Sequence, residues 1–81
     1  MKVRLRMFAI LRERSGVSDM ELELADGATV GVAMEEVGRR FGAIKELLPR
    51  AAAAVNLSYA KAGALLHNGD ELALIPPVSG G

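Results

Sequence analysis

The sequence predicts an α+β fold in which one main helix packs on one face of a small mixed β-sheet. Three patterns support this: period-two apolar alternation at 2–8 and 20–24, a helical apolar spacing at 30–41, and an apolar strand at 71–75. The chain has 81 residues, which is one small domain and leaves no room for separate substrate and cofactor domains. We therefore expect one folded domain over residues 1–77 and a flexible tail over 78–81.

The first two segments predict a β-hairpin with one apolar face. In the first segment the apolar side chains alternate with charged ones: Val3, Leu5 and Met7 against Lys2, Arg4 and Arg6. The second segment alternates in the same way: Met20, Leu22 and Leu24 against Glu21 and Glu23. Opposite charges across an antiparallel pair contribute roughly 0.2–1 kcal/mol each. The basic N-terminal run is therefore interpreted as a neutralised sheet face rather than a nucleic-acid patch.

Residues 29–42 predict an amphipathic helix. Its apolar residues recur at spacings of four, three and four: Val30, Met34, Val37 and Phe41. Thr29 can act as the N-cap, and Gly42 stands where a C-terminal cap is expected. Gly31 and Gly38 weaken the helix by roughly 1 kcal/mol each, so tertiary packing must hold it.

The second half of the chain predicts two more strands. A short apolar run over 44–48 ends at Pro49, and 51–55 predicts a strand despite its alanines. Asn68-Gly69 is typical of a tight turn, and the last strand over 71–75 is stopped by Pro76-Pro77, since proline cannot donate to a sheet. The expected order is strand, strand, helix, strand, strand.

The composition excludes several kinds of function. Ten basic and ten acidic residues cancel, so we expect neither a nucleic-acid nor a membrane partner. No apolar stretch reaches the roughly 18 residues that span a bilayer, and the N-terminus lacks a signal-peptide core, which predicts a cytoplasmic protein. Cysteine is absent, which removes disulfides, thiolate nucleophiles and cysteine-based zinc sites. The single histidine, His67, lies in a turn-like run and is interpreted as a solvated loop residue.

The remaining chemical group of interest is the α-carboxylate of Gly81. The sequence has no paired carboxylates at a telling spacing, no glycine-rich phosphate loop and no nucleophile beside a base. A terminal glycine has no Cβ, so it can enter a channel too narrow for other residues. Its carboxylate becomes open to attack by sulfur or nitrogen once another enzyme adenylates it. A frayed tail or an expression scar is the alternative, although the position just after Pro76-Pro77 weighs against it.

Three segments resemble one family. The run over 68–81, which ends in Pro-Pro-Val-Ser-Gly-Gly, resembles the C-terminus of the small subunit of molybdopterin synthase, a ubiquitin-like sulfur carrier. The segments 8–13 (Phe-Ala-Ile-Leu-Arg-Glu) and 54–56 (Ala-Val-Asn) resemble the same family. Between Tyr59 and His67 the sequence departs from the family pattern, so the loop within 57–67 is not predicted.

The resemblance implies a ubiquitin-like β-grasp fold and a sulfur-transfer cycle. An E1-like activating enzyme would adenylate Gly81 with ATP, and a sulfurtransferase would convert it to a thiocarboxylate. The tail, consisting of Val78, Ser79, Gly80 and Gly81, would then enter the large subunit of the synthase. There the sulfur would attack the pterin precursor to make the dithiolene of the molybdenum cofactor. The catalytic groups would lie on the large subunit, this chain would be the sulfur-donating co-substrate, and no metal or permanently bound cofactor is expected. A heterotetramer of two carriers on a dimer of large subunits is implied.

The sequence also predicts a docking surface beside the tail. Phe8 and Ile75 have the outward parity of their strands, and these strands are neighbours in a β-grasp sheet. We expect them to form one exposed patch near Pro76 and Pro77, with Tyr59 as a further candidate member. The alternative is that these side chains belong to the core. Arg12 matches an arginine of the family and could pair with an acidic group of the activating enzyme; otherwise it is a surface residue.

Other functions remain open from the sequence. A related carrier could serve thiamine, cysteine or tRNA thiolation, or could be a ubiquitin-like modifier joined to protein lysines. From a different class, the chain could be a non-covalent ubiquitin-like interaction module with an inert tail. A free-standing enzyme is the weakest candidate, because no set of residues within the chain could perform the chemistry.

Overall fold

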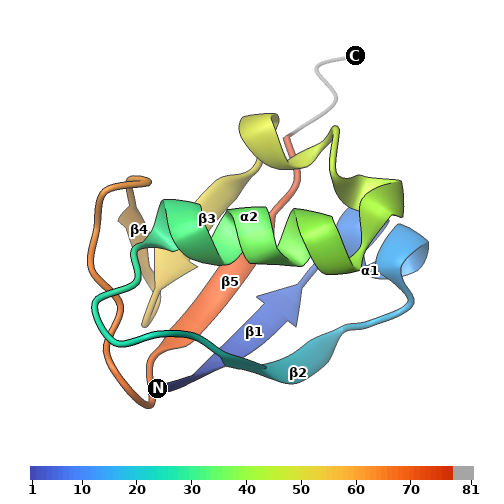
Figure 1. Ribbon diagram of the computed structural model, residues 1–81. Helices are drawn as coiled ribbons and strands as arrows, with labels where there is room; N and C mark the ends of the chain where they lie inside the picture. The colour runs from blue at the N-terminus through green and yellow to red at the C-terminus, as the bar shows by residue number, and fades with distance from the viewer. Residues whose placement is uncertain (78–81) are drawn as a thin grey trace.

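The computed structural model describes residues 1–77, which form one β-sheet with a helical layer on one face. The strands are β1 (Lys2–Met7), β2 (Asp19–Glu23), β3 (Ala52–Val55), β4 (Ser58–Ala60) and β5 (Glu71–Ile75). The helices are α1 (Ala9–Ser15), α2 (Val30–Arg40) and two short 3₁₀ helices, η1 (Gly42–Ile44) and η2 (Leu48–Arg50). α2 crosses one face of the sheet, as Figure 1 shows. The predicted α+β fold is confirmed, while the predicted tail over 78–81 lies outside the described residues.

The sheet is mixed, with β1 and β5 at its centre. Its strand order is β2-β1-β5-β3-β4. β1 pairs antiparallel with β2 and parallel with β5, whereas β5 pairs antiparallel with β3. The expected pairing of the first two strands is confirmed, with Arg4 opposite Glu21. The last strand returns beside the first, as predicted, and Figure 1 shows the two side by side.

Three sequence-based expectations were wrong. β1 and β2 are separated by α1 rather than by turns alone, and β4 adds a strand that was not predicted. Leu11 is the buried residue of α1, and no residue of the three-residue β4 is buried. Neither element could therefore produce a detectable apolar period. The C-cap of α2 is Phe41 rather than Gly42, because Gly42 begins η1.

The core lies between the sheet and the helical layer and is aliphatic. Val3, Leu5 and Met7 of β1 are at most 1% exposed, as the alternation predicts. They pack with the inward residues of β5, β2, α1 and α2: Leu72, Leu74, Leu22, Leu11, Val30, Ala33 and Val37. The predicted N-cap of α2 is confirmed, since the hydroxyl of Thr29 accepts a hydrogen bond from the Val32 amide at 3.2 Å. Among the described residues no polar or charged side chain is buried.

Ion pairs neutralise the open face of the sheet. Arg4 Nη1 lies 3.0 Å from Asp19 Oδ1, and the Lys2 ammonium lies 3.8 Å from a carboxylate oxygen of Glu21. On the other side of β1, Arg6 lies 3.7 Å from Glu71 of β5. These pairs are diagonal across the strands rather than directly opposite. They support the interpretation that the basic N-terminal run is a compensated sheet face.

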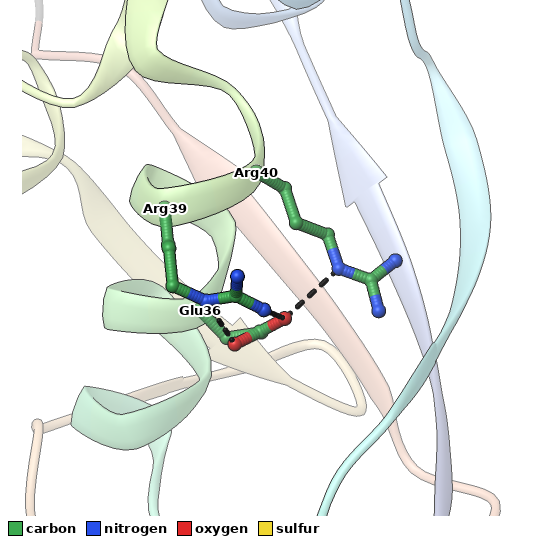
Figure 2. Close-up of polar contacts among 3 residues, drawn as sticks. All are labelled: Glu36, Arg39 and Arg40. Atoms are coloured by element: carbon green, nitrogen blue, oxygen red, sulfur yellow. Dashed lines mark hydrogen bonds and ion pairs between the residues drawn. The ribbon is translucent and has the colours of Figure 1, made fainter.

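One carboxylate on α2 binds two arginines. Glu36 accepts hydrogen bonds from Arg39 at 2.6 and 3.1 Å and from Arg40 Nε at 2.9 Å, as Figure 2 shows. The spacings of three and four residues place all three side chains on one side of the helix. The hydrogen bonds from Arg39, and next those from Arg40, lower the pKa of Glu36. Both guanidinium groups are thus engaged within the helix.

The β3–β4 hairpin turns through two residues with positive φ. Asn56 and Leu57 have φ values of 50° and 72°, and Leu57 is 90% exposed. Turns of this kind favour glycine at the second central position. The amide group of Asn56 donates to Asp70 Oδ1 at 2.9 Å, and its oxygen accepts from the Glu71 amide at 3.0 Å. Asn56 therefore joins the hairpin to the start of β5, while Leu57 makes the turn costly.

Replacing Leu57 with glycine should stabilise the protein. Leucine in the left-handed region costs about 1–2 kcal/mol, and the greater freedom of glycine in the unfolded chain offsets part of the gain. We expect Leu57→Gly to raise the free energy of unfolding by about 0.5–1 kcal/mol, as measured by urea denaturation. Leu57→Ala keeps the Cβ atom and should give no comparable gain. Equal effects of the two substitutions would show that the backbone strain does not destabilise the fold.

Asp70 should make stability depend on acid pH. The hydrogen bond from Asn56, followed by that from the His67 amide to Asp70 Oδ2 at 2.8 Å, lowers the pKa of Asp70. A carboxyl with a lowered folded-state pKa stabilises the fold above its unfolded pKa of about 3.9, and this contribution is lost as pH falls through the folded value. We expect unfolding free energies measured between neutral and acid pH to fall less steeply in Asp70→Asn than in the parent. Glu13→Gln, at an exposed position of α1 that forms no ion pair among residues 1–77, is the control; an unchanged slope in Asp70→Asn would contradict the assignment.

Candidate functional site

The chain leaves the sheet at the edge where β1 and β5 end together. The parallel register places Met7 beside Leu74, so the next residues, Phe8 and Ile75, follow at the same level. Figure 1 shows both strands running toward this edge. Pro76 is half-buried and Pro77 is exposed. The chain thus leaves the sheet after Ile75, at the level of Phe8.

An apolar strip runs from this edge across the open face of the sheet. Ile75 lies opposite Ala52, and Ala73 lies opposite Ala54, which in turn lies opposite Tyr59 on β4. Since paired residues share a face, these side chains are on the side away from α2. We name as the apolar strip the six residues Phe8, Ala52, Ala54, Tyr59, Ala73 and Ile75. Its register places Tyr59 two strands away from Ile75, on the same face.

The predicted patch members differ in exposure. Phe8 is 38% exposed and is the N-cap of α1 rather than a strand residue, and Tyr59 is 80% exposed. Ile75 is half-buried, but it alternates with Leu72 and Leu74, which are completely buried. The outward parity inferred for Phe8 and Ile75 thus agrees with the structure. The three alanines of the strip were missed by sequence reasoning, because only the strand register shows that they share its face.

A charged zone borders the strip at Phe8. The guanidinium carbon of Arg6 lies 5.7 Å from the centroid of the Phe8 ring, a cation–π distance, while the same group lies 3.7 Å from Glu71. Arg12 is exposed on α1, which begins directly after Phe8. The edge of the sheet therefore presents an apolar surface with arginine side chains beside it, which suits a protein partner.

The described residues do not assemble a catalytic centre. Within residues 1–77 no group of three histidine, cysteine, aspartate or glutamate side chains could hold a metal ion. His67 is 77% exposed, and its partner is Asp70, whose side chain faces the hairpin turn rather than the edge where the chain leaves the sheet. The four residues predicted to carry the chemistry, Val78, Ser79, Gly80 and Gly81, lie outside the described part of the chain. No helix within residues 1–77 is long and apolar enough to cross a membrane.

Comparisons with known proteins agree on one family. Residues 5–81 match the sequence model of the ThiS family. The molybdopterin synthase sulfur carrier subunit of Arabidopsis thaliana is 34% identical over 80 residues, covering 99% of this chain and 83% of the plant protein. The corresponding subunit of Chlamydomonas reinhardtii is 32% identical and is covered completely, as is this chain.

Solved structures show the same fold. SAMP1 of Haloferax volcanii superposes with a TM-score of 0.90 at 29% identity, covering both chains completely. A putative molybdopterin-converting factor subunit 1 of Pyrococcus furiosus gives 0.87 at 33% identity, covering 95% of this chain and 98% of the other. The fold is therefore the ubiquitin-like β-grasp that the resemblance implied. A chain in the complex of subunits 1 and 2 of the Helicobacter pylori molybdopterin-converting factor has the same fold. It superposes with a TM-score of 0.70 at 23% identity, and both chains are covered completely.

Proposed function

The chain belongs to the ThiS family, and we propose that it is the sulfur-carrying small subunit of a molybdopterin synthase. The observation that carries the proposal is full-length similarity to sulfur carrier subunits together with a family match that extends to residue 81. The Pro-Pro-Val-Ser-Gly-Gly run at 76–81 supplies the chemical group that such a carrier needs.

The proposed chemistry takes place on the carboxylate of Gly81. An activating enzyme joins this carboxylate to the α-phosphate of ATP and releases pyrophosphate, which gives an acyl adenylate. Sulfur delivered by a sulfurtransferase then displaces AMP and leaves a thiocarboxylate. In the large subunit this sulfur attacks the pterin precursor, and the carrier leaves as the carboxylate after hydrolysis. Because activation consumes ATP, the proposal places the protein in the cytoplasm.

The geometry of the folded domain supports a carrier whose terminal residue reacts inside the active site of a partner. Four residues beyond Pro77 span at most about 13–14 Å when extended. That reach is enough for a terminal glycine to enter a recessed active site while the domain stays outside. The apolar strip beside the exit would dock on the large subunit, and Arg12 would face an acidic group of the activating enzyme. The catalytic acid–base groups would belong to the partner.

A second candidate function keeps the activated tail but changes the acceptor. The similarity to SAMP1 favours conjugation to protein lysines. A second Haloferax volcanii structure, of small archaeal modifier protein 1, superposes with a TM-score of 0.87 at 27% identity. A carrier for another thiolation pathway uses the same chemistry. Affinity purification of the tagged protein from its native cells separates these candidates. Only the first predicts a large synthase subunit as the main partner, whereas a modifier predicts a ladder of covalent adducts.

Adding one residue after Gly81 should abolish sulfur loading without changing the fold. We expect the intact mass, measured after incubation with an activating enzyme, ATP and a sulfur source, to rise by the difference between sulfur and oxygen. The extended variant should show no rise, because its terminal carboxylate is displaced and no longer on a glycine that fits a narrow channel. Loading of the extended variant would contradict the proposal. So would failure of the parent with an activating enzyme that loads another carrier.

Charge on the apolar strip should weaken docking without unfolding the protein. Phe8→Asp introduces a carboxylate at a 38% exposed position beside the tail's exit. We expect its affinity for the large subunit, measured by calorimetry, to fall by about tenfold or more, which corresponds to about 1.4 kcal/mol. Val32→Asp is the matched control, because Val32 is 49% exposed on α2 and lies away from the strip. Equal affinities of parent and Phe8→Asp would show that the partner docks elsewhere.

A further inference from the structure

An open groove of about 860 Å³ lies between α2 and the β3–β4 side of the sheet, and one end of it reaches Ala52, the partner of Ile75. One wall is α2, with Met34 at its middle, and the opposite wall is the segment from Tyr59 to Ala62. Ala52 and Ala53 of β3 also line it, and Leu48 and Pro49 lie at one end. The functions proposed above use only Ala52 and Tyr59 of this lining, as members of the apolar strip.

Small residues create the groove and fix its ends. Alanine is unfavourable in strands, yet β3 begins with three alanines, and a larger side chain at Ala53, which faces α2, would fill the space. A Cβ on Gly31 would lie 3.3 Å from the Ala62 oxygen, and a Cβ on Gly38 would lie 3.3 Å from Leu48 Cδ1. The two glycines that weaken α2 thus let the flanking loops close the groove at either end. The two glycines are seven positions apart, which corresponds to about 10 Å of helix and matches three extended residues at about 3.3 Å each.

The groove runs along a free strand edge. β4 is the last strand of the sheet and pairs with β3 alone. Val55 and Ser58 flank a two-residue turn and so form a hydrogen-bonded pair. Alternation then directs the N–H and C=O of Tyr59 outward, toward the free edge. An extended segment could bond to these groups while its alternate side chains enter the groove.

The charges at the rim select the kind of segment. Two of the chain's three lysines, Lys45 and Lys61, line the groove, and both are exposed. Neither takes part in an ion pair among residues 1–77. Arg39 also lines the groove but is bound by Glu36 (Figure 2), so Glu35 is the single opposing charge left at the rim. Two available cations against one carboxylate favour acidic groups on an incoming chain.

We propose that this groove binds an extended segment of a partner protein, with apolar side chains at alternate positions and acidic residues at its ends. The segment adds to the free edge of β4, places its apolar side chains against Met34 and the alanines, and sets its acidic residues near Lys45 and Lys61. The proposal does not depend on the function proposed for Gly81.

The test selects random heptapeptides displayed on phage against the full-length protein. We expect the enriched peptides to combine alternating apolar residues with aspartate or glutamate. Synthetic versions should shift the NMR amide signals of Ser58, Tyr59 and Ala60 and the methyl signal of Met34. The double variant Lys45→Glu/Lys61→Glu should lower their affinity, measured by fluorescence anisotropy, by about tenfold or more. Ala60→Leu, at a half-buried position that pairs with Ala53 and lines the groove on the α2 side, should have a similar effect by filling it.

Controls separate loss of binding from loss of structure. Arg14→Glu reverses an exposed charge on α1, away from the groove, and should leave the affinity unchanged. The thermal unfolding of every variant is followed by circular dichroism, so that only folded variants are compared. The proposal is overturned if no peptide is enriched, if the enriched peptides shift Phe8, Ala73 and Ile75 instead of Ser58, Ala60 and Met34, or if the folded groove variants bind as well as the parent.

Discussion

The parallel pairing of β1 with β5 is the constraint on which the rest of the structure depends. Leu5 lies beside Leu72 and Met7 beside Leu74, and all four side chains are essentially inaccessible to water. Parallel strands cannot be joined by a tight turn, so everything between them must form a long crossover connection. That connection supplies α2, which covers the inner face, and β3, which pairs with the far side of β5. It also brings the carboxyl ends of β1 and β5 to the same edge, where the chain leaves the sheet.

The burial of the central strands explains how much could be predicted. Three features could be predicted because each alternates several core residues with more exposed ones. They are the pairing of β1 with β2, the helix over 30–40 and the strand over 71–75. α1 was missed because it buries Leu11 alone, and β4 because it buries none of its residues. The tail motif could be identified from residue types alone. Of the apolar strip, Phe8, Tyr59 and Ile75 were predicted as one patch, but its three alanines and the groove could not be predicted, since they depend on the strand register and on small residues that carry no pattern of their own.

The described domain has an aliphatic core, because no polar side chain among residues 1–77 is buried. The domain determines where the chain leaves the sheet. Pro76 and Pro77 have no backbone N–H to extend the hydrogen bonding beyond β5, and their rings fix their φ angles. The chain is thus released from the sheet at a defined point beside Phe8. The specificity of a carrier of this design must come from the surfaces that its partners recognise.

Tyr59 belongs to both the apolar strip and the groove, so the binding of partners to these two surfaces is coupled. Its ring is part of the apolar strip through its pairing with Ala54, and the residue also lines the groove beside β4. A partner that fixes Tyr59 from one side changes its freedom for the other, and such coupling is reciprocal in the binding free energies. Substituting Tyr59 would therefore confound the two surfaces. Phe8 contacts only the strip and Lys45 only the groove, so the two must be separated through residues such as these.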